Sequence, residues 1–180
     1  MKSNYVDKQE FMAALIEHKA KVDKAKAENL PKPKISEYIG ECLLKIATNL
    51  AKRSNFNRYS YKDEMILDAL ENAILYLDNF DPTNIKQNPF GYFTKNCWYT
   101  FLRRKAKEEK QQYIKYKMTE NFGVLSDEEL AEFSDNANPS QLYENMYEFI
   151  DNFEKDIQKK KQQLKDKREF ENFIPEDFEI

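Results

Sequence analysis

Apolar residues recur at steps of three and four along much of this chain, the spacing that places side chains on one face of an α-helix. The clearest stripe predicts a helix that begins at Ser60 and ends before Asp81-Pro82. Ser60 followed by Asp63 resembles a capping box, because a hydroxyl accepts a free backbone N–H and a carboxylate favours the positive end of the helix dipole. The stripe expected to be buried consists of Ile66, Leu70, Ala73, Ile74 and Leu77.

The opposite face of this predicted helix is acidic. It carries Glu64, Asp68 and Glu71, and two leucines, Leu67 and Leu75, lie beside these carboxylates. An acidic helix face is commonly a solvated surface and nothing more. Apolar side chains among the carboxylates favour the other interpretation, which is a docking surface for a partner.

Asn88-Pro89 predicts the start of a second helix, with asparagine as the N-cap and proline at the first helical position. The aromatic residues that follow divide between two faces. The face expected to join the core carries Phe90, Phe93, Cys97, Trp98 and Phe101. The other face mixes aromatic, amide and cationic groups, which are Tyr92, Lys95, Asn96, Tyr99 and Arg103, and the basic character continues through Arg104, Lys105, Lys107 and Lys110.

This second face has two interpretations. Cations that hold phosphates, beside aromatic rings on which unpaired bases stack, are the combination that single-stranded nucleic acid requires. Aromatic residues at helical spacing are also common in protein cores. The spacing alone leaves both interpretations open.

Two further helices are predicted before this pair. The first begins at Asp7 with Glu10 closing a capping box, and its narrow stripe of Phe11, Leu15, His18 and Val22 suggests a docked arm. Pro31 and Pro33 separate it from the second, which should pair with the acidic helix as the core of the domain. Its apolar positions are Ile35, Ile39, Cys42, Leu43, Ile46 and Leu50.

The remainder of the chain is polar. The basic helix is expected to end through Met118-Thr119-Glu120, a further helix is predicted over 141–157, and 159–168 should be an exposed continuation or a flexible linker. The chain is therefore predicted to be all-α, since it has three glycines and no alternating strand pattern. The predicted parts are a helical arm (1–30), a compact domain (35–117), an acidic and charged extension with a linker (118–168) and a C-terminal tail (169–180).

Charge is segregated along the chain. The net charge of −3 does not by itself indicate a nucleic-acid binder. However, residues 86–117 carry nine basic and two acidic side chains, whereas residues 118–157 carry eleven acidic and one basic. This distribution predicts a bipolar molecule with one surface for DNA and others kept away from it.

Several classes of function are disfavoured. The lone histidine has no Glu-x-x-His spacing for a metal site, and the sequence has no Gly-rich phosphate loop or nucleophile elbow. We therefore expect no enzyme activity, metal or cofactor. Cys42 and Cys97 fit core positions in a reducing compartment. A signal peptide and a membrane-length apolar run are both missing from the printed sequence, so a cytoplasmic location is expected.

The order of the two central helices resembles the second conserved region of bacterial sigma factors. DEMILDALENAILYLDNFD is similar to the part that binds the coiled coil of the largest RNA polymerase subunit, and PFGYFTKNCWYTFLRRKAKE to the part that melts and recognises the promoter. The resemblance implies core-polymerase binding by Glu64, Leu67, Asp68 and Glu71. It implies DNA binding by Tyr92, Phe93, Lys95, Asn96, Tyr99, Thr100, Arg103, Arg104 and Lys107, with Tyr92 or Phe93 as the base-stacking residue.

The whole chain is similar to the late-transcription sigma factors of T-even-type bacteriophages. The similarity includes NYVDKQEFMAALIEHK, NLAKRSNFNRY, the NFDPT…NPFGYFT hinge and the acidic, aromatic end ENFIPEDFEI. It implies activity in the cytoplasm of an infected bacterium, with host polymerase core, an AT-rich late promoter and a late-transcription co-activator as partners. The tail is implied to bind the phage DNA sliding clamp through Phe173, Ile174, Phe178 and Ile180.

The chain also departs from the sigma pattern. Aligned on Phe90, it has Asn96 and Cys97 where primary sigma factors have paired tryptophans, and Trp98 falls one residue late. No helix-turn-helix region for the upstream promoter element follows Lys117, so upstream recognition is absent or comes from a partner. The alternative function is a helical accessory protein that binds polymerase or single-stranded DNA without specifying start sites.

Overall fold

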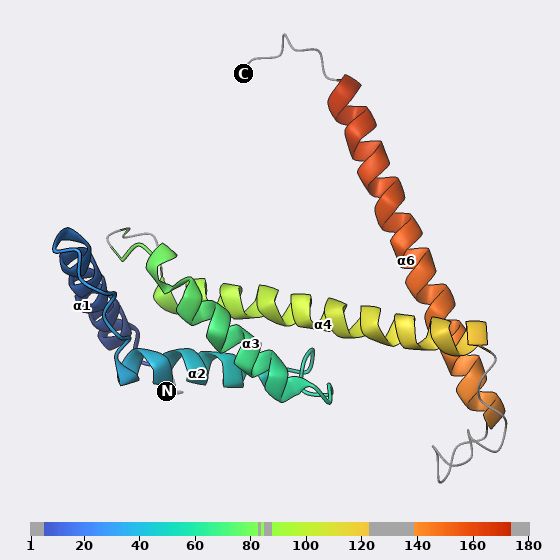
Figure 1. The fold of residues 1–180 in the computed structure, drawn as a ribbon, viewed down its shortest axis with the longest axis horizontal. Coiled ribbons are helices and arrows are strands. Elements are labelled where there is room, and N and C mark those ends of the chain that lie inside the picture. Colours follow the sequence, from blue (N-terminus) through green and yellow to red (C-terminus); the bar gives the residue numbers. More distant parts are fainter. Residues whose placement is uncertain (1–5, 83, 85–87, 123–138, 174–180) are drawn as a thin grey trace. The chain divides into compact units, whose positions relative to one another are not determined.

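The computed structural model describes residues 6–82, 84, 88–122 and 139–173, with the side chains of 122, 139–140 and 166–173 left undescribed. The regular structure of these residues is helical throughout, which confirms the predicted all-α class. The elements are α1 (Lys8–Ala27), α2 (Glu37–Ala51), α3 (Lys62–Leu75), the short 3₁₀ helix η1 (Leu77–Asn79), α4 (Pro89–Phe122) and α6 (Pro139–Phe173) (Figure 1).

The chain divides into two compact units, Met1–Lys107 and Glu108–Ile180. The boundary falls inside α4, ten residues before the end expected for the compact domain, and α1 belongs to the first unit. The candidate site lies in the first unit.

The N-terminal helix forms as the sequence predicts. The Asp7 carboxylate accepts hydrogen bonds from the backbone N–H groups of Gln9 and Glu10 and so caps α1. The Glu10 carboxylate accepts from the Tyr38 hydroxyl at 3.2 Å, which ties α1 to α2. The predicted stripe of α1 is buried, namely Phe11, Leu15, His18 and Val22.

Helices α2 and α3 pack together as predicted, and Ser36 caps α2 by accepting from the Ile39 N–H. The start of α3 was predicted incorrectly. The helix begins at Lys62 with Tyr61 as its N-cap residue and no side-chain cap, so Ser60 lies outside it. Tyr61 stacks on the Tyr59 ring at 5.1 Å, and this local contact belongs to the turn that leads into the helix.

The buried stripe of α3 is rotated from the predicted one. Its buried residues are Met65, Ala69 and Ala73, and Leu77 is buried in η1. Ala73 and Leu77 are therefore buried as predicted, whereas Ile66 and Leu70 are only partly buried and Ile74 is exposed. Because alanines let a neighbouring helix approach closely, the small residues take the centre of the contact and the larger ones flank it.

Helix α4 starts at Pro89 as predicted, and the Asn88 side chain accepts from the Phe90 N–H at 3.1 Å. Phe93, Cys97 and Phe101 are fully buried in the core of the first unit, and Phe90 and Trp98 pack against it at its margin. The predicted core face of this helix is confirmed.

In the second unit, the C-terminal part of α4 packs against α6. Tyr113 stacks on Phe153 at 4.5 Å, and its hydroxyl donates to Glu154 at 2.9 Å. This hydrogen bond raises the pKa of Tyr113, and bonds from Lys117 and Tyr113 lower the pKa of Glu154. Helix α4 ends at Phe122, two residues after the predicted run-out at 118–120. Residues 159–165 are helical and exposed, which agrees with the predicted continuation and not with the flexible linker.

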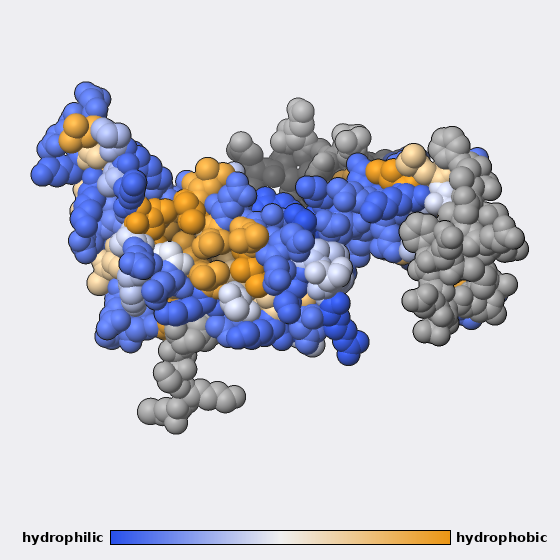
Figure 2. Space-filling view, turned by 60° about the horizontal axis from the view of Figure 1, so that its bottom comes forward, coloured by the Kyte–Doolittle hydropathy of each residue, from blue (hydrophilic) through white to orange (hydrophobic). Residues whose placement is uncertain are grey.

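The surface of the first unit is not uniformly polar. Figure 2 shows hydrophobic side chains gathered on one face of this unit with hydrophilic side chains around them. An exposed apolar area of this kind is a candidate interaction surface. None of the helices, among the described residues, is long and apolar enough to cross a membrane.

Candidate functional site

The acidic face of α3 is exposed over most of its length. Glu64, Leu67, Glu71 and Leu75 all face solvent, so carboxylates alternate with large apolar side chains. Such a surface offers a partner both charge and apolar area. Three of the four residues expected to bind polymerase are therefore available for contact.

Asp68, the fourth, has a partner inside the protein. Its carboxylate accepts from the Arg104 guanidinium at 3.1 Å, and both side chains are partly buried. This ion pair joins α3 to α4. The predicted contacts of Asp68 with polymerase and of Arg104 with DNA would compete with this ion pair, and both stay predictions.

A second set of bonds between the same helices is centred on Asn72. Its Nδ2 donates to Asn96 Oδ1 at 2.6 Å, and its Oδ1 accepts from Arg103 at 3.1 Å. Arg103 also donates to the Thr100 hydroxyl at 3.0 Å, and that hydroxyl donates to the Asn96 carbonyl at 3.1 Å. Thr100 is buried, and its hydroxyl helps to orient the guanidinium of Arg103. Its contact with DNA stays a prediction.

The two predicted base-stacking residues are enclosed by other aromatic rings. Phe93 is 0% exposed, and its ring lies 5.7 Å from each of the rings of Phe11 and Phe80. Tyr92 is half-buried and contacts the Phe80 ring at 5.2 Å and the Phe93 ring at 5.1 Å. Stacking by Phe93 stays a prediction that requires the ring to leave the core, because a fully buried ring cannot meet a base.

A groove opens where α3 meets α4. Its volume is about 530 Å³, and its lining consists of Asn72 and Tyr76 from the α3 side with Asn96, Tyr99, Leu102, Arg103 and Ala106 from α4. Tyr76 is 44% exposed and Tyr99 is 54% exposed, so two phenol rings border the groove. The Lys95 ammonium lies 5.9 Å from the centre of the Tyr99 ring, within cation–π range. We refer to this feature as the tyrosine groove.

A smaller depression of about 260 Å³ adjoins the tyrosine groove. Asn72 and Arg103 line both features, but here they are joined by carboxylates and further cations. The other lining residues are Asp68, Glu71, Leu75, Thr100, Arg104 and Lys107. The α3–α4 surface thus changes from mixed charge in this depression to aromatic, amide and cationic groups in the tyrosine groove.

Asn72 and Tyr76 were not among the predicted site residues. Both follow Asp68 at steps of four, so continuing the α3 face beyond its carboxylates would have included them. The predicted clamp-binding residues belong to the end of the chain. Phe173 is the last residue of α6, and its side chain, like Ile174, Phe178 and Ile180, lies outside the described residues.

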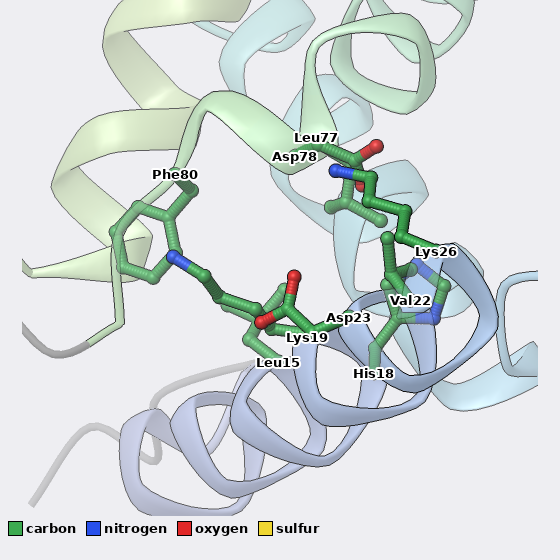
Figure 3. Close-up of a pocket in the computed structure, with 9 residues that line it drawn as sticks. All are labelled: Leu15, His18, Lys19, Val22, Asp23, Lys26, Leu77, Asp78 and Phe80. Carbon is green, nitrogen blue, oxygen red and sulfur yellow. The ribbon is translucent and has the colours of Figure 1, made fainter. Parts of the chain in front are cut away.

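A cavity of about 50 Å³ lies between α1 and η1, far too small for a base (Figure 3). Leu77, Asp78 and Phe80 line one side of it and α1 the other, and the Lys19–Asp81 bond at 3.2 Å holds the two segments together. His18 is 6% exposed, and its Nε2 has no hydrogen-bond partner among the described residues. Burial therefore lowers the pKa of this histidine, while the attraction of Asp78 opposes the effect.

The stability of the first unit should depend on the protonation of His18. Because its pKa is lower in the folded state, the unfolded chain binds more protons, and the free energy of unfolding should fall as pH drops below about 6.5. Asp78 attracts the added proton, and Lys21 and Lys32 repel it. The slope attributable to one histidine is at most about 1.4 kcal/mol per pH unit.

Urea unfolding followed by Trp98 fluorescence would measure this dependence, since Trp98 is the single tryptophan and contacts the Phe56 ring in the first unit. His18→Gln should remove the histidine contribution and leave that of the carboxylates. If the free energy of unfolding changes with pH in the same way for both proteins between about pH 5 and pH 7, the pKa of His18 is the same in the folded and unfolded states. That result would contradict the prediction.

Comparison with known proteins adds no family assignment. No protein-family model matches the chain, and no curated protein matches it. The fold and the site define a helical protein in which an acidic, partly apolar helix face is tied to a cationic and aromatic one.

Proposed function

We propose that this protein is a small sigma factor that binds a bacterial RNA polymerase core and directs it to AT-rich late promoters of a bacteriophage. In this proposal, α3 binds the coiled coil of the largest polymerase subunit and α4 contacts the melted promoter strand. The observation that carries the proposal is the pairing of an exposed acidic and apolar face on α3 with an exposed cationic and aromatic face on α4.

The bonds between these helices support a joint role. Asp68–Arg104, Asn72–Asn96 and Asn72–Arg103 hold α3 and α4 in one arrangement. A partner that binds α3 therefore also fixes the position of α4. A factor that must place a DNA-binding helix at a defined point on polymerase needs this property.

The exposed cations on α4 support contact with a polyanion. Lys95, Arg103 and Lys107 face solvent within the first unit, and Thr100 orients the guanidinium of Arg103. Each cation that neutralises a phosphate releases a counterion, so affinity for DNA should fall steeply with salt concentration. The acidic face of α3 suits a basic partner, and the cationic face of α4 suits an acidic partner such as DNA.

The remaining parts of the proposal rest on the sequence. The tail, through Phe173, Ile174, Phe178 and Ile180, would anchor the protein to the phage sliding clamp, and a late-transcription co-activator would supply upstream recognition. Prolines such as Pro175 stiffen a short anchor, and a tether raises effective concentration without new promoter contacts. The protein would act in the cytoplasm of the infected bacterium.

Run-off transcription with bacterial core polymerase on a panel of AT-rich promoters tests this function. We expect transcripts that start at one defined position on a subset of templates, and permanganate-reactive thymines at the same place. Core binding and DNA retention without any defined start would instead indicate an accessory protein that binds polymerase or single-stranded DNA.

The same assay tests the tail separately. Removing residues 170–180 should leave basal initiation intact and abolish the stimulation by clamp loaded on DNA, and Phe178→Ala should cause most of that loss, because few residues carry an anchor's binding energy. Full stimulation of the truncated protein by the clamp would rule out the anchor. Loss of basal initiation would mean that the tail is part of the folded structure that initiation requires.

A further inference from the structure

We infer that the tyrosine groove between α3 and α4 holds an unpaired base of single-stranded DNA, with Tyr76 and Tyr99 as the stacking residues. The inference rests on the proposed function in that it locates the base contact of the DNA-facing helix. It differs from the sequence-based expectation, which assigned this contact to Tyr92 and Phe93.

The size and exposure of the groove fit a base. Its volume of about 530 Å³ lies within the range of about 300–1,000 Å³ that is usual for small-molecule sites. Tyr76 and Tyr99 expose about half of their surface, whereas Phe93 exposes none. An aromatic ring that is held on a helix and open to solvent is the surface on which bases of single-stranded nucleic acid stack.

The polar lining fits the edge of a base. The Asn72 and Asn96 amides are bonded to each other at 2.6 Å, and Arg103 donates to Asn72, so the position of each amide is fixed. These bonds use one of the two hydrogens on Asn72 Nδ2 and neither hydrogen on Asn96 Nδ2. Amide groups recognise bases through such donors and acceptors.

The charges around the groove favour DNA over a protein helix. The groove lining contains a guanidinium and no carboxylate, and Lys95 lies beside the Tyr99 ring. The neighbouring depression has more cations, since Arg104 and Lys107 join Arg103 there, but it also includes Asp68 and Glu71, which would repel a phosphate backbone, and it has no aromatic ring in its lining on which a base could stack. The tyrosine groove is therefore the part of the α3–α4 surface that suits a polyanion with an unstacked base.

Photo-crosslinking tests the inference directly. The full-length protein would be irradiated with a single-stranded oligodeoxynucleotide that carries 5-iodouracil in place of one thymine, and the crosslinked residue would be mapped by mass spectrometry. We expect the crosslink at Tyr76 or Tyr99. A crosslink at Tyr92 or in another part of the chain, or crosslinking no stronger than that of the matching duplex, would overturn the inference.

Substitutions give a second test that does not depend on crosslinking chemistry. Tyr76→Ala and Tyr99→Ala should each weaken binding of the oligodeoxynucleotide about tenfold, and Tyr76→Phe and Tyr99→Phe, which keep the ring, should bind nearly as well as the natural protein. Tyr147→Ala is a matched control, because Tyr147 is 50% exposed and lies on α6. Unchanged affinity in both alanine variants would contradict the inference.

The outcome separates this inference from the proposed function. If the protein initiates at a specific promoter and its groove variants still bind the oligodeoxynucleotide normally, the groove is not the base-binding site. The proposed sigma function would then stand without it. If the crosslink maps to the groove but the protein neither binds core polymerase nor initiates transcription, the groove is a single-stranded DNA site. The proposed sigma function would then be wrong. Weaker core binding by Tyr76→Ala, with unchanged DNA binding, would assign the groove to polymerase and overturn the inference.

Discussion

Replacing Glu64 and Glu71 with lysine is expected to abolish co-purification of this protein with bacterial RNA polymerase core. Both carboxylates are exposed on α3, where they alternate along the chain with the exposed leucines Leu67 and Leu75. In an interface that excludes water, loss of one charged partner costs about 2–5 kcal/mol, and a reversed charge adds repulsion from the basic partner. Two such changes would reduce the affinity below what a pull-down detects.

The choice of residues matters for this experiment. Asp68 lies on the same face, but its substitution would also break the ion pair with Arg104 and alter α4, the helix proposed to contact DNA. A matched control is Glu144→Lys with Glu148→Lys, which makes the same charge change at exposed positions of α6. Circular dichroism should show unchanged helicity in both double variants. Equal affinity for core in the two proteins would remove α3 as the polymerase-binding face.

The sequence predicted most of the features that depend on neighbouring residues, although the Ser60 cap of α3 was wrong. Asp7 and the Asn88-Pro89 pair mark helix starts because each acts within one turn of its own helix. The buried apolar stripes of α1 and of the first half of α4 were also predicted correctly, because large apolar residues dominate both faces. The buried face of α3 was predicted only in part, because Ala73 and Leu77 were included but Met65 and the small Ala69 were left out.

The candidate site was only partly predictable, because the contacts that shape it join distant residues. Asp68 and Arg104 are 36 positions apart, and Asn72 and Asn96 are 24 apart. A sequence pattern places each of these residues on a helix face but does not say that the faces meet. The same limit applies to Phe93, whose burial depends on Phe11 and Phe80.

Phe93→Ala is expected to destabilise the first unit by about 3–5 kcal/mol, the usual cost of removing a buried phenylalanine side chain. The ring is fully buried and lies within 5.7 Å of the Phe11 and Phe80 rings, so its loss would leave a cavity where α1, α4 and the segment after η1 meet. Urea unfolding followed by Trp98 fluorescence would measure the change.

Tyr99→Ala provides the contrast for this prediction. Tyr99 lies six residues further along α4 and is half exposed, so its substitution should change stability by no more than about 0.5 kcal/mol. We therefore expect Phe93→Ala to lower stability strongly and Tyr99→Ala to lower binding of single-stranded DNA. The reverse pattern, a stable Phe93→Ala protein with lost DNA binding, would mean that Phe93 leaves the core to stack on a base, as the sigma resemblance alone implies.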